Sequence, residues 1–421
     1  MAQRKKKPTG HKVQMLAKAH HKNEFLRKLK HILNDYCGET LYPLIPHSVL
    51  DKIYSNRGFS FKIIPDEGVT IPQGMLNHIK RSIPAMGETI TTSLTENGPE
   101  MTINDFVTVG NTIKRFSIHI KSDDFPNSQK VKTALSDICD DENYFVRFSR
   151  KLNNLFQSYE FWYSKMGKPI YWLKYEPKVS DTGTGINNFI IVKKQVPETI
   201  LISIDGNVRP VCRVGWGGKD YNFQWLLLKH GDLNSTSASD DKPMNVYVQS
   251  HALMRLEERV DGIVAGILHF NLFSSLQEPK VSYDYNHNML IEYQIFGFKV
   301  GYLRADIIDE KVIIRTFLFL TQSGTPEGQL LNKNTGLKML DKKYLAIDKL
   351  STFMTSDIGN NMAVRKIFQD ADCQCMLDLN EKIGSLCSKH PSQSTCELML
   401  NYLRYHEKLI PETVEEQTEH G

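Results

Sequence analysis

The most informative pattern of apolar and polar positions lies in residues 244–267, where a strand is followed by a helix. Residues 244–249 are strand-like, and Ser250 is expected to cap a helix that begins at His251. A helix rotates by roughly 100° per residue, so its apolar side chains gather on one side. They are Leu253, Leu256, Val260, Ile263, Val264 and Ile267. This side is predicted to face the core.

The opposite side of the same helix is polar. It carries His251, Arg255, Glu258 and Arg259 within about one third of the circumference. A solvated surface has this pattern, and so does one wall of a binding site. The β-rich run at 281–321 could pack against either side of the helix, and only one of these arrangements would build a site.

Elsewhere the chain is predicted to contain both helices and strands. Helices are expected at 12–36 and 128–166, and strand-like alternation is found at 88–94 and 101–120. Asp205-Gly206 indicates a tight hairpin turn between two strands. The strands of the second half are expected at 189–194, 200–204, 208–214, 223–229, 281–285, 290–296, 298–308 and 312–321. The last four form an antiparallel meander, and the residues after 325 are predicted to be helical.

The predicted fold class is therefore α+β, with two domains. A chain of 421 residues is too long for one ordinary domain. The second domain is predicted to have a helix followed by an antiparallel β-meander, then a helical C-terminal region. The predicted boundaries are a disordered basic arm at 1–10, an N-terminal α+β domain at 11–178, a β-rich α+β domain with the candidate site at 189–322, a helical C-terminal region at 323–410 and an acidic tail at 411–421.

The composition is that of a soluble globular protein, with 40% hydrophobic and 24% charged residues. No apolar run reaches the length of about eighteen residues that a membrane span needs. The basic N-terminal stretch is not followed by the apolar segment of a secretory signal. These features predict a cytoplasmic protein without a membrane partner.

Positive charge is concentrated at the N-terminus. The first thirty residues contain ten Lys or Arg and a single acidic residue, Glu24. Such a segment attracts phosphates through counterion release, so nucleic acid is the expected partner, RNA more than DNA. The alternative is a solubilising leader followed by an ordinary surface helix. The residues expected to contact nucleic acid are Arg4, Lys5, Lys6, Lys7, Lys12 and Arg259.

Seven cysteines, an odd number scattered over a long chain, do not form a disulfide framework, so reduced thiols are expected. Cys373, Cys375, Cys387 and Cys396 cluster with His390, and thiolates with an imidazole are the ligands that zinc prefers. The CxC spacing departs from the paired CxxC pattern of zinc knuckles. Buried or idle cysteines in a helical tail are therefore the favoured interpretation, and neither a metal nor a cofactor is predicted.

The order of elements around the central helix resembles a known fold. A strand, a helix with the spacing His251-xxx-Arg255-xxx-Arg259, and a meander whose last strand carries Arg315-Thr316 resemble the small ribonuclease fold of barnase-like and RelE-like toxin domains. The resemblance covers about residues 244–322.

This resemblance implies a metal-independent endoribonuclease that acts on RNA. Such chemistry requires a base for the ribose 2′-hydroxyl, an acid for the leaving oxygen and cations on the phosphate. His251 would be the base or the acid, and Arg255 and Arg315 would bind the phosphate. Thr316, Tyr302 or Glu258 would complete the site. The alternative is a non-catalytic protein that binds nucleic acid or a protein partner, of the kind carried by mobile elements or phages, in which Arg255 simply pairs with Glu258.

Overall fold

The computed structural model describes residues 10–217, 222–233, 242–356, 358, 361–383 and 399. The chain divides into two compact units. Unit 1 comprises residues 1–159 and 172–194, and unit 2 comprises residues 160–171 and 195–421. The predicted disordered arm at 1–10 and acidic tail at 411–421 lie outside the described residues, except for Gly10.

This division differs from the predicted single boundary between residues 178 and 189. The chain leaves unit 1 after Tyr159, returns to it at Trp172 and leaves it again after Lys194. The reason lies in strand pairing. Residues 189–192, which were expected to open the second domain, pair in parallel with residues 62–65 of unit 1.

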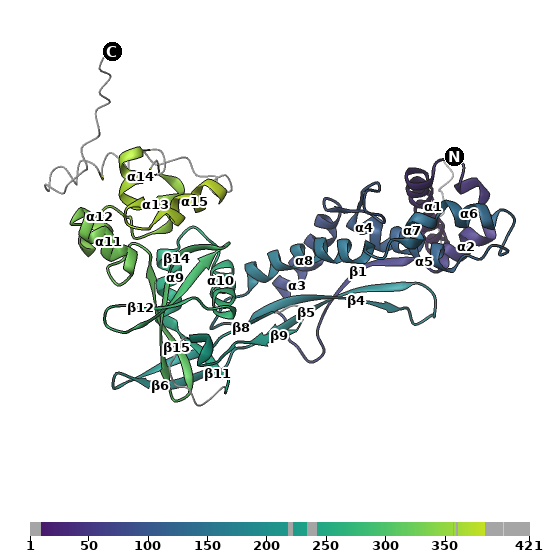
Figure 1. Ribbon diagram of the computed structural model, residues 1–421. Coiled ribbons are helices and arrows are strands. Elements are labelled where there is room, and N and C mark those ends of the chain that lie inside the picture. Colours follow the sequence, from purple (N-terminus) through teal and green to yellow (C-terminus); the bar gives the residue numbers. More distant parts are fainter. Residues whose placement is uncertain are drawn as a thin grey trace, which may run out of the picture. The chain divides into compact units, whose positions relative to one another are not determined.

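Unit 1 consists of helices packed around a small sheet with the strand order β1-β5-β4 (Figure 1). Its helices are α1 (Gly10–Cys37), η1 (Tyr42–Leu44), α2 (His47–Ser55), α3 (Gln73–Gly87), α4 (Ile103–Asp105), η2 (Phe106–Gly110), α5 (Asn111–His119), α6 (Ser128–Ala134), α7 (Ser136–Asp140) and α8 (Tyr144–Tyr163), the last of which ends in unit 2. Its strands are β1 (Gly58–Pro65), β2 (Thr91–Thr92), β3 (Met101–Thr102), β4 (Ile170–Val179) and β5 (Ile186–Gln195).

The strand predicted at 101–120 is wrong, because only Met101–Thr102 is extended and the rest is helical. Thr108 and Thr112 are the kind of β-branched residue that suggests a strand. In the structure each hydroxyl donates a hydrogen bond to the carbonyl four residues earlier, of Asn104 and Thr108 respectively. This bonding satisfies the hydroxyls inside a helix, and burial of the segment supplies the packing that overrides local propensity.

Aromatic side chains join helix α8 to the sheet of unit 1. Phe148 stacks on Phe106 with a centroid distance of 4.6 Å, and it meets Tyr175 of β4 edge-on at 5.4 Å. Phe148, Leu152, Leu155, Phe156 and Tyr159 are all buried and recur at helical spacing. The periodic aromatic stripe of α8 is therefore core.

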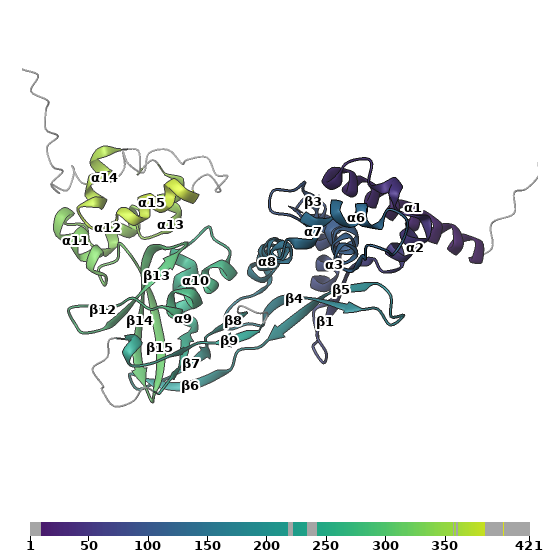
Figure 2. The same cartoon turned by 45° about the vertical axis from the view of Figure 1, so that its right-hand side comes forward.

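Unit 2 is built on a sheet with the strand order β12-β13-β14-β15-β11-β7-β6, and β10 also pairs with β11 (Figure 2). Its strands are β6 (Thr199–Ile204), β7 (Asn207–Arg213), β8 (Gly215–Gly217), β9 (Phe223–Trp225), β10 (Leu227–Leu228), β11 (Met244–Gln249), β12 (Val281–Tyr283), β13 (Met289–Ile295), β14 (Phe298–Ile308) and β15 (Lys311–Phe319). Its helices are η4 (Gly231–Leu233), α9 (Ser250–Arg259), α10 (Ala265–Gln277), α11 (Pro326–Thr335), α12 (Met339–Tyr344), α13 (Leu350–Thr355), α14 (Met362–Gln369) and α15 (Gln374–Ile383).

The predicted α+β class, the meander and the helical C-terminal region are confirmed. Strands β12 to β15 follow one another in antiparallel pairs. The sheet also contains a parallel pair that the sequence did not indicate, because β11 lies beside β15 from Asn245↔Lys311 to Val248↔Ile314. Helix α15 packs on β14, and the C-terminal helices share one apolar core with the sheet, so they belong to the same unit.

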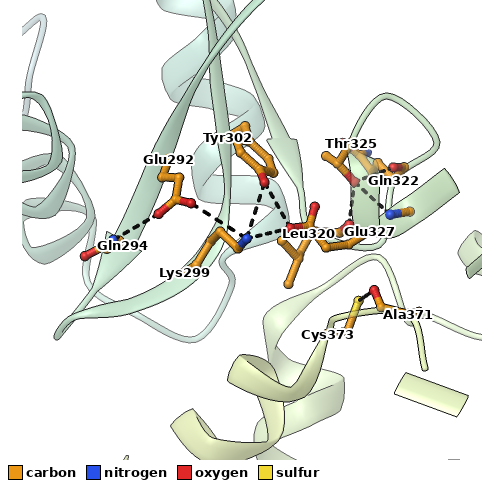
Figure 3. A network of polar contacts seen from close by, with 11 residues as sticks. Glu292, Gln294, Lys299, Tyr302, Leu320, Gln322, Thr325, Glu327, Ala371 and Cys373 are labelled. Atoms are coloured by element: carbon orange, nitrogen blue, oxygen red, sulfur yellow. Dashed lines mark hydrogen bonds and ion pairs between the residues drawn. The ribbon is translucent and has the colours of Figure 1, made fainter. Parts of the chain in front are cut away.

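A buried polar network joins the C-terminal helices to the sheet (Figure 3). Lys299 of β14 lies 2.5 Å from Glu327 of α11, and the Tyr302 hydroxyl donates a hydrogen bond of 2.9 Å to the same carboxylate oxygen. Glu292 of β13 is 3.7 Å from the Lys299 ammonium. Burial lowers the pKa of Lys299 and the Glu327 carboxylate raises it, with a net rise above its ordinary value. Glu327 is 4% exposed, so the loss of its charge would leave a largely dehydrated ammonium with one weaker partner.

We expect the substitution Glu327→Gln to lower the free energy of unfolding by roughly 3 kcal/mol, because the partly buried Lys299 ammonium then keeps only its weaker ion pair with Glu292. Urea unfolding followed by circular dichroism measures the change. The matched control is Glu310→Gln, which removes the exposed ion pair between Lys242 and Glu310. The control should leave the midpoint almost unchanged, since solvent screens exposed pairs. Equal midpoints for the two variants would show that the buried pair does not stabilise the unit.

Candidate functional site

A pocket of about 430 Å³ in unit 2 brings together two residues that the sequence singled out, His251 and Arg315. It lies where β11 ends and α9 begins, beside β15 and the hairpin that joins β6 to β7. Gln249 and Ser250 also line it. Helix α9 and strand β15 are far apart in sequence, and the parallel pairing of β11 with β15 places them side by side.

His251 lies in the first turn of α9 and is exposed. The predicted cap at Ser250 is wrong, because Ser250 is the first residue of the helix and Gln249 occupies the cap position. The Gln249 side chain makes no capping hydrogen bond, so no side chain at this position satisfies the first N–H groups of α9. Within the described part of the chain, the His251 imidazole has no hydrogen-bond partner. The first backbone N–H groups of α9 and the imidazole of His251 are therefore available to a ligand in the pocket.

Arg315 enters the pocket from β15 and is held by two carboxylates. Its guanidinium donates a hydrogen bond of 2.7 Å to Asp306 of β14 and another to Asp205 of the β6–β7 turn. Burial lowers the pKa of Arg315, while Asp306 and Asp205 raise it, with a net rise above its ordinary value. These bonds fix the orientation of the guanidinium, and they offset much of its charge.

Sequence reasoning missed Asp205 and Arg209, which also line the pocket. Asp205 and Gly206 have φ angles of 50° and 74°, as the predicted tight turn requires. Arg209 is exposed and forms no ion pair with any residue that the structure describes. The sequence does show two opposite charges close to this turn, Asp205 and Arg209. It does not show that the turn lies beside α9, which only the fold reveals.

The other predicted site residues lie outside this pocket. Arg255 forms an ion pair of 2.6 Å with Glu258 on the same helix, as the alternative interpretation expected. Arg259 is mostly buried and forms an ion pair with Asp348. Thr316 follows Arg315 at a register shift in the pairing of β15 with β14, and it does not line the pocket. Tyr302 belongs to the network around Glu327 described above.

The basic arm is described only in part. Arg4, Lys5, Lys6 and Lys7 lie outside the described residues, and Lys12 lies in the first turn of α1, where the backbone alone is described. From Met15 to His21 every side chain of α1 is exposed, and the first buried residue of this helix is Phe25. Residues 15–21 of α1 therefore make no core contacts.

No group of three metal-ligating side chains is found among the residues that the structure describes. Of the cysteine cluster, Cys373 is buried and Cys375 is partly buried. Burial raises the pKa of Cys375 to about 11 and that of Cys373 further, which keeps both thiols protonated at neutral pH. Cys387, His390 and Cys396 lie outside the described residues.

Polar contacts anchor the side of α9 that faces the rest of the unit. Glu257 forms an ion pair of 2.6 Å with Lys165, and its other oxygen lies 3.3 Å from Nε2 of the buried His269 in α10. The backbone N–H of Met166 donates a hydrogen bond of 2.9 Å to Nδ1 of His269. His269 and Lys165 hold the pKa of Glu257 at about 2 against the opposing effect of burial. These contacts fix the rotation of α9 and therefore the direction of His251.

Comparison with models of known protein families, with curated proteins and with solved structures finds no match to this chain. Among the described residues, no helix combines the length and the apolar character needed to cross a membrane.

We expect His269 to make folding pH-dependent. Burial lowers the pKa of His269 below its ordinary value of 6.5, against the effect of Glu257, which raises it. The unfolded chain therefore binds a proton that the folded chain does not, and stability should decrease as the pH falls below about 6.5, by at most about 1.4 kcal/mol per pH unit.

Urea unfolding of the wild type and of His269→Asn at several pH values between 7 and 5 measures this effect. The Asn side-chain oxygen can accept the Met166 N–H, so the variant removes the titration and keeps that hydrogen bond. The variant should lose less stability than the wild type over this range. Parallel pH profiles for the two proteins would contradict the role of His269.

Proposed function

We propose that this protein is a metal-independent endoribonuclease whose active site is the pocket of His251 and Arg315. One observation carries the proposal: two residues identified from separate segments of the sequence line the same pocket, together with Arg209 and Asp205. An imidazole, a carboxylate and two guanidinium groups are the set of groups that cleavage of RNA by its own 2′-hydroxyl needs.

The reaction assigns one task to each kind of group. The 2′-oxygen attacks phosphorus as its proton passes to a base, and the bond to the 5′-oxygen breaks as that oxygen receives a proton from an acid. A cyclic 2′,3′-phosphate and a free 5′-hydroxyl result. His251 and Asp205 line the same pocket and are assigned the acid and base roles, since imidazole exchanges protons near neutral pH.

Phosphate binding is assigned to Arg209 and Arg315. Arg209 is exposed and unpaired within the described residues, so its donors are free for a phosphate. Arg315 is less free, because Asp306 and Asp205 already accept its hydrogen bonds. The uncapped N-terminus of α9 adds backbone donors and a partial positive charge on the same side of the pocket.

The alternative is a protein that binds RNA without cleaving it. The basic N-terminal segment favours this second function, because it supplies positive charge far along the chain from the pocket, and its described side chains from Met15 to His21 are exposed. Binding through such residues depends on salt and not on a base or an acid. The two functions are separated by measuring cleavage and binding on the same variants.

We expect the purified protein to cleave a mixed RNA pool in excess EDTA and His251→Asn to reduce the rate by about 100-fold or more, because a positioned acid or base contributes about that factor. RNA binding by this variant should be largely kept. The matched control is His287→Asn, which replaces another exposed histidine of unit 2 and should cleave at the wild-type rate. Binding by the wild type with no cleavage would establish the alternative function.

We expect removal of residues 1–14 to weaken RNA binding. This deletion removes five basic residues, Arg4, Lys5, Lys6, Lys7 and Lys12, and stops before the buried part of α1. If the arm contacts phosphates, the slope of log affinity against log salt should become less steep by up to about 3.5 for single-stranded RNA. Fluorescence anisotropy at several salt concentrations measures the slope. An unchanged slope would mean that the arm is only a leader.

A further inference from the structure

A second pocket, of about 480 Å³, lies within unit 1 and has no role in the proposed function. It is bounded by α2, by α5 and by the residues that follow α5 up to Phe125. Its volume falls within the range of roughly 300–1,000 Å³ that is typical of sites for small molecules.

One wall of this pocket is apolar and partly aromatic. Ile53 of α2 is buried, and the rings of Phe116 and Phe125 are partly exposed and line the pocket. Aromatic faces of this kind contact flat, apolar ligand bodies favourably. The wall therefore suits the body of an organic molecule more than an inorganic ion.

Arg115 forms the polar end of the pocket and lacks a counter-charge. Its guanidinium donates one hydrogen bond to the backbone carbonyl of Asn56, and its buried Nε has no partner. No described carboxylate forms an ion pair with it. Burial lowers the pKa of Arg115, against a smaller effect of Tyr144. A half-buried cation without a counter-charge is costly, and an anionic ligand would offset that cost.

Three further polar side chains at the pocket set its charge. Lys52 is exposed and forms no ion pair in the described part of the chain, and His119 is also exposed. Asp124 is the acidic member of the lining, and its carboxylate accepts a hydrogen bond of 2.8 Å from the Lys121 N–H. Two cations therefore oppose one anion, so the pocket has a positive charge.

We propose that this pocket binds a small organic anion in which a carboxylate or phosphate group is attached to an aromatic body. Arg115 binds two oxygens of the anionic group through its planar guanidinium, and Lys52 adds a second positive charge. Phe116 and Phe125 contact the aromatic body. Asp124 repels the anionic group and limits the affinity.

The first test measures binding to the full-length protein by isothermal titration calorimetry with three probes: 1-naphthyl phosphate, 1-naphthoate and the neutral 1-naphthalenemethanol. Saturable binding of an anionic probe is expected, at least about tenfold tighter than the neutral probe, because a charge-assisted contact is worth that much. The ratio between the two anions shows whether the pocket prefers phosphate or carboxylate. Equal affinity for all three probes, or no saturable binding of either anion, would overturn the proposal.

Two substitutions with opposite expected effects locate the binding. Arg115→Gln should weaken binding of the preferred anion by about tenfold to a hundredfold. Asp124→Asn removes a like charge and keeps an oxygen for the Lys121 N–H, so it should tighten binding by about threefold or more. A gain in affinity cannot result from misfolding, which keeps the test decisive if Arg115→Gln is unstable.

The matched controls are Arg81→Gln, an exposed arginine on α3 of the same unit, and Arg209→Ala in the pocket of unit 2. Arg81→Gln should bind the anionic probes as the wild type does, and Arg209→Ala should keep the binding that Arg115→Gln weakens and Asp124→Asn tightens. A loss of probe binding in Arg209→Ala with no change in Arg115→Gln and Asp124→Asn would assign the binding to the pocket of unit 2, and the proposal would be wrong.

Discussion

Burial of one face of α9 against the sheet is the constraint on which the rest of unit 2 depends. Leu253, Leu256 and Val260 are buried in the core that α9 shares with β11 and β15. Since the helix cannot rotate without exposing them, the direction of every other side chain on α9 is fixed. The ion pair of Arg259 with Asp348 and the contacts of Glu257 with Lys165 and His269 hold the same rotation from its polar flanks.

This constraint also separates two kinds of polar residue on one helix. Glu257 and Arg259 meet partners inside the unit and act as anchors. His251, in the first turn, meets no partner among the described residues and faces the pocket. A polar residue on a partly buried helix therefore indicates function only once it is known which side chains of the neighbouring elements contact it.

The fold could be predicted where the pattern of side chains is simple. The alternation in β13 to β15 and the apolar side of α9 identified the meander and the helix, because burial on one face imposes a period on the sequence. The prediction failed at 101–120, where hydroxyls bonded to the helix backbone make β-branched residues acceptable in a helix. It also failed for the parallel pair of β11 and β15, since pairing across such a distance leaves no local signal.

The residues of the candidate pocket could be named from the sequence only in part. His251 could be named because it lies on the polar side of a helix with a clear period, and Arg315 was named from the resemblance to small ribonuclease domains. Arg209 and Asp205 lie at a hairpin whose turn was recognised, but the sequence does not show which distant element a hairpin approaches. Arg255 and Arg259 lie on the same polar side of the helix as His251 in the sequence pattern. In the structure they form ion pairs with Glu258 and Asp348, which the pattern alone does not distinguish from a place in the pocket.

The exchange of segments between the two units has a consequence for folding during synthesis. Met166 belongs to unit 2, and its backbone N–H bonds to His269, 103 residues later in the chain. At a synthesis rate of about 5–20 residues per second, Met166 waits on the order of 5–20 s for this partner. Residues 172–194 are made during that interval and complete the chain of unit 1, so the segment 160–171 is joined at both ends to a complete unit while the rest of unit 2 is still being made.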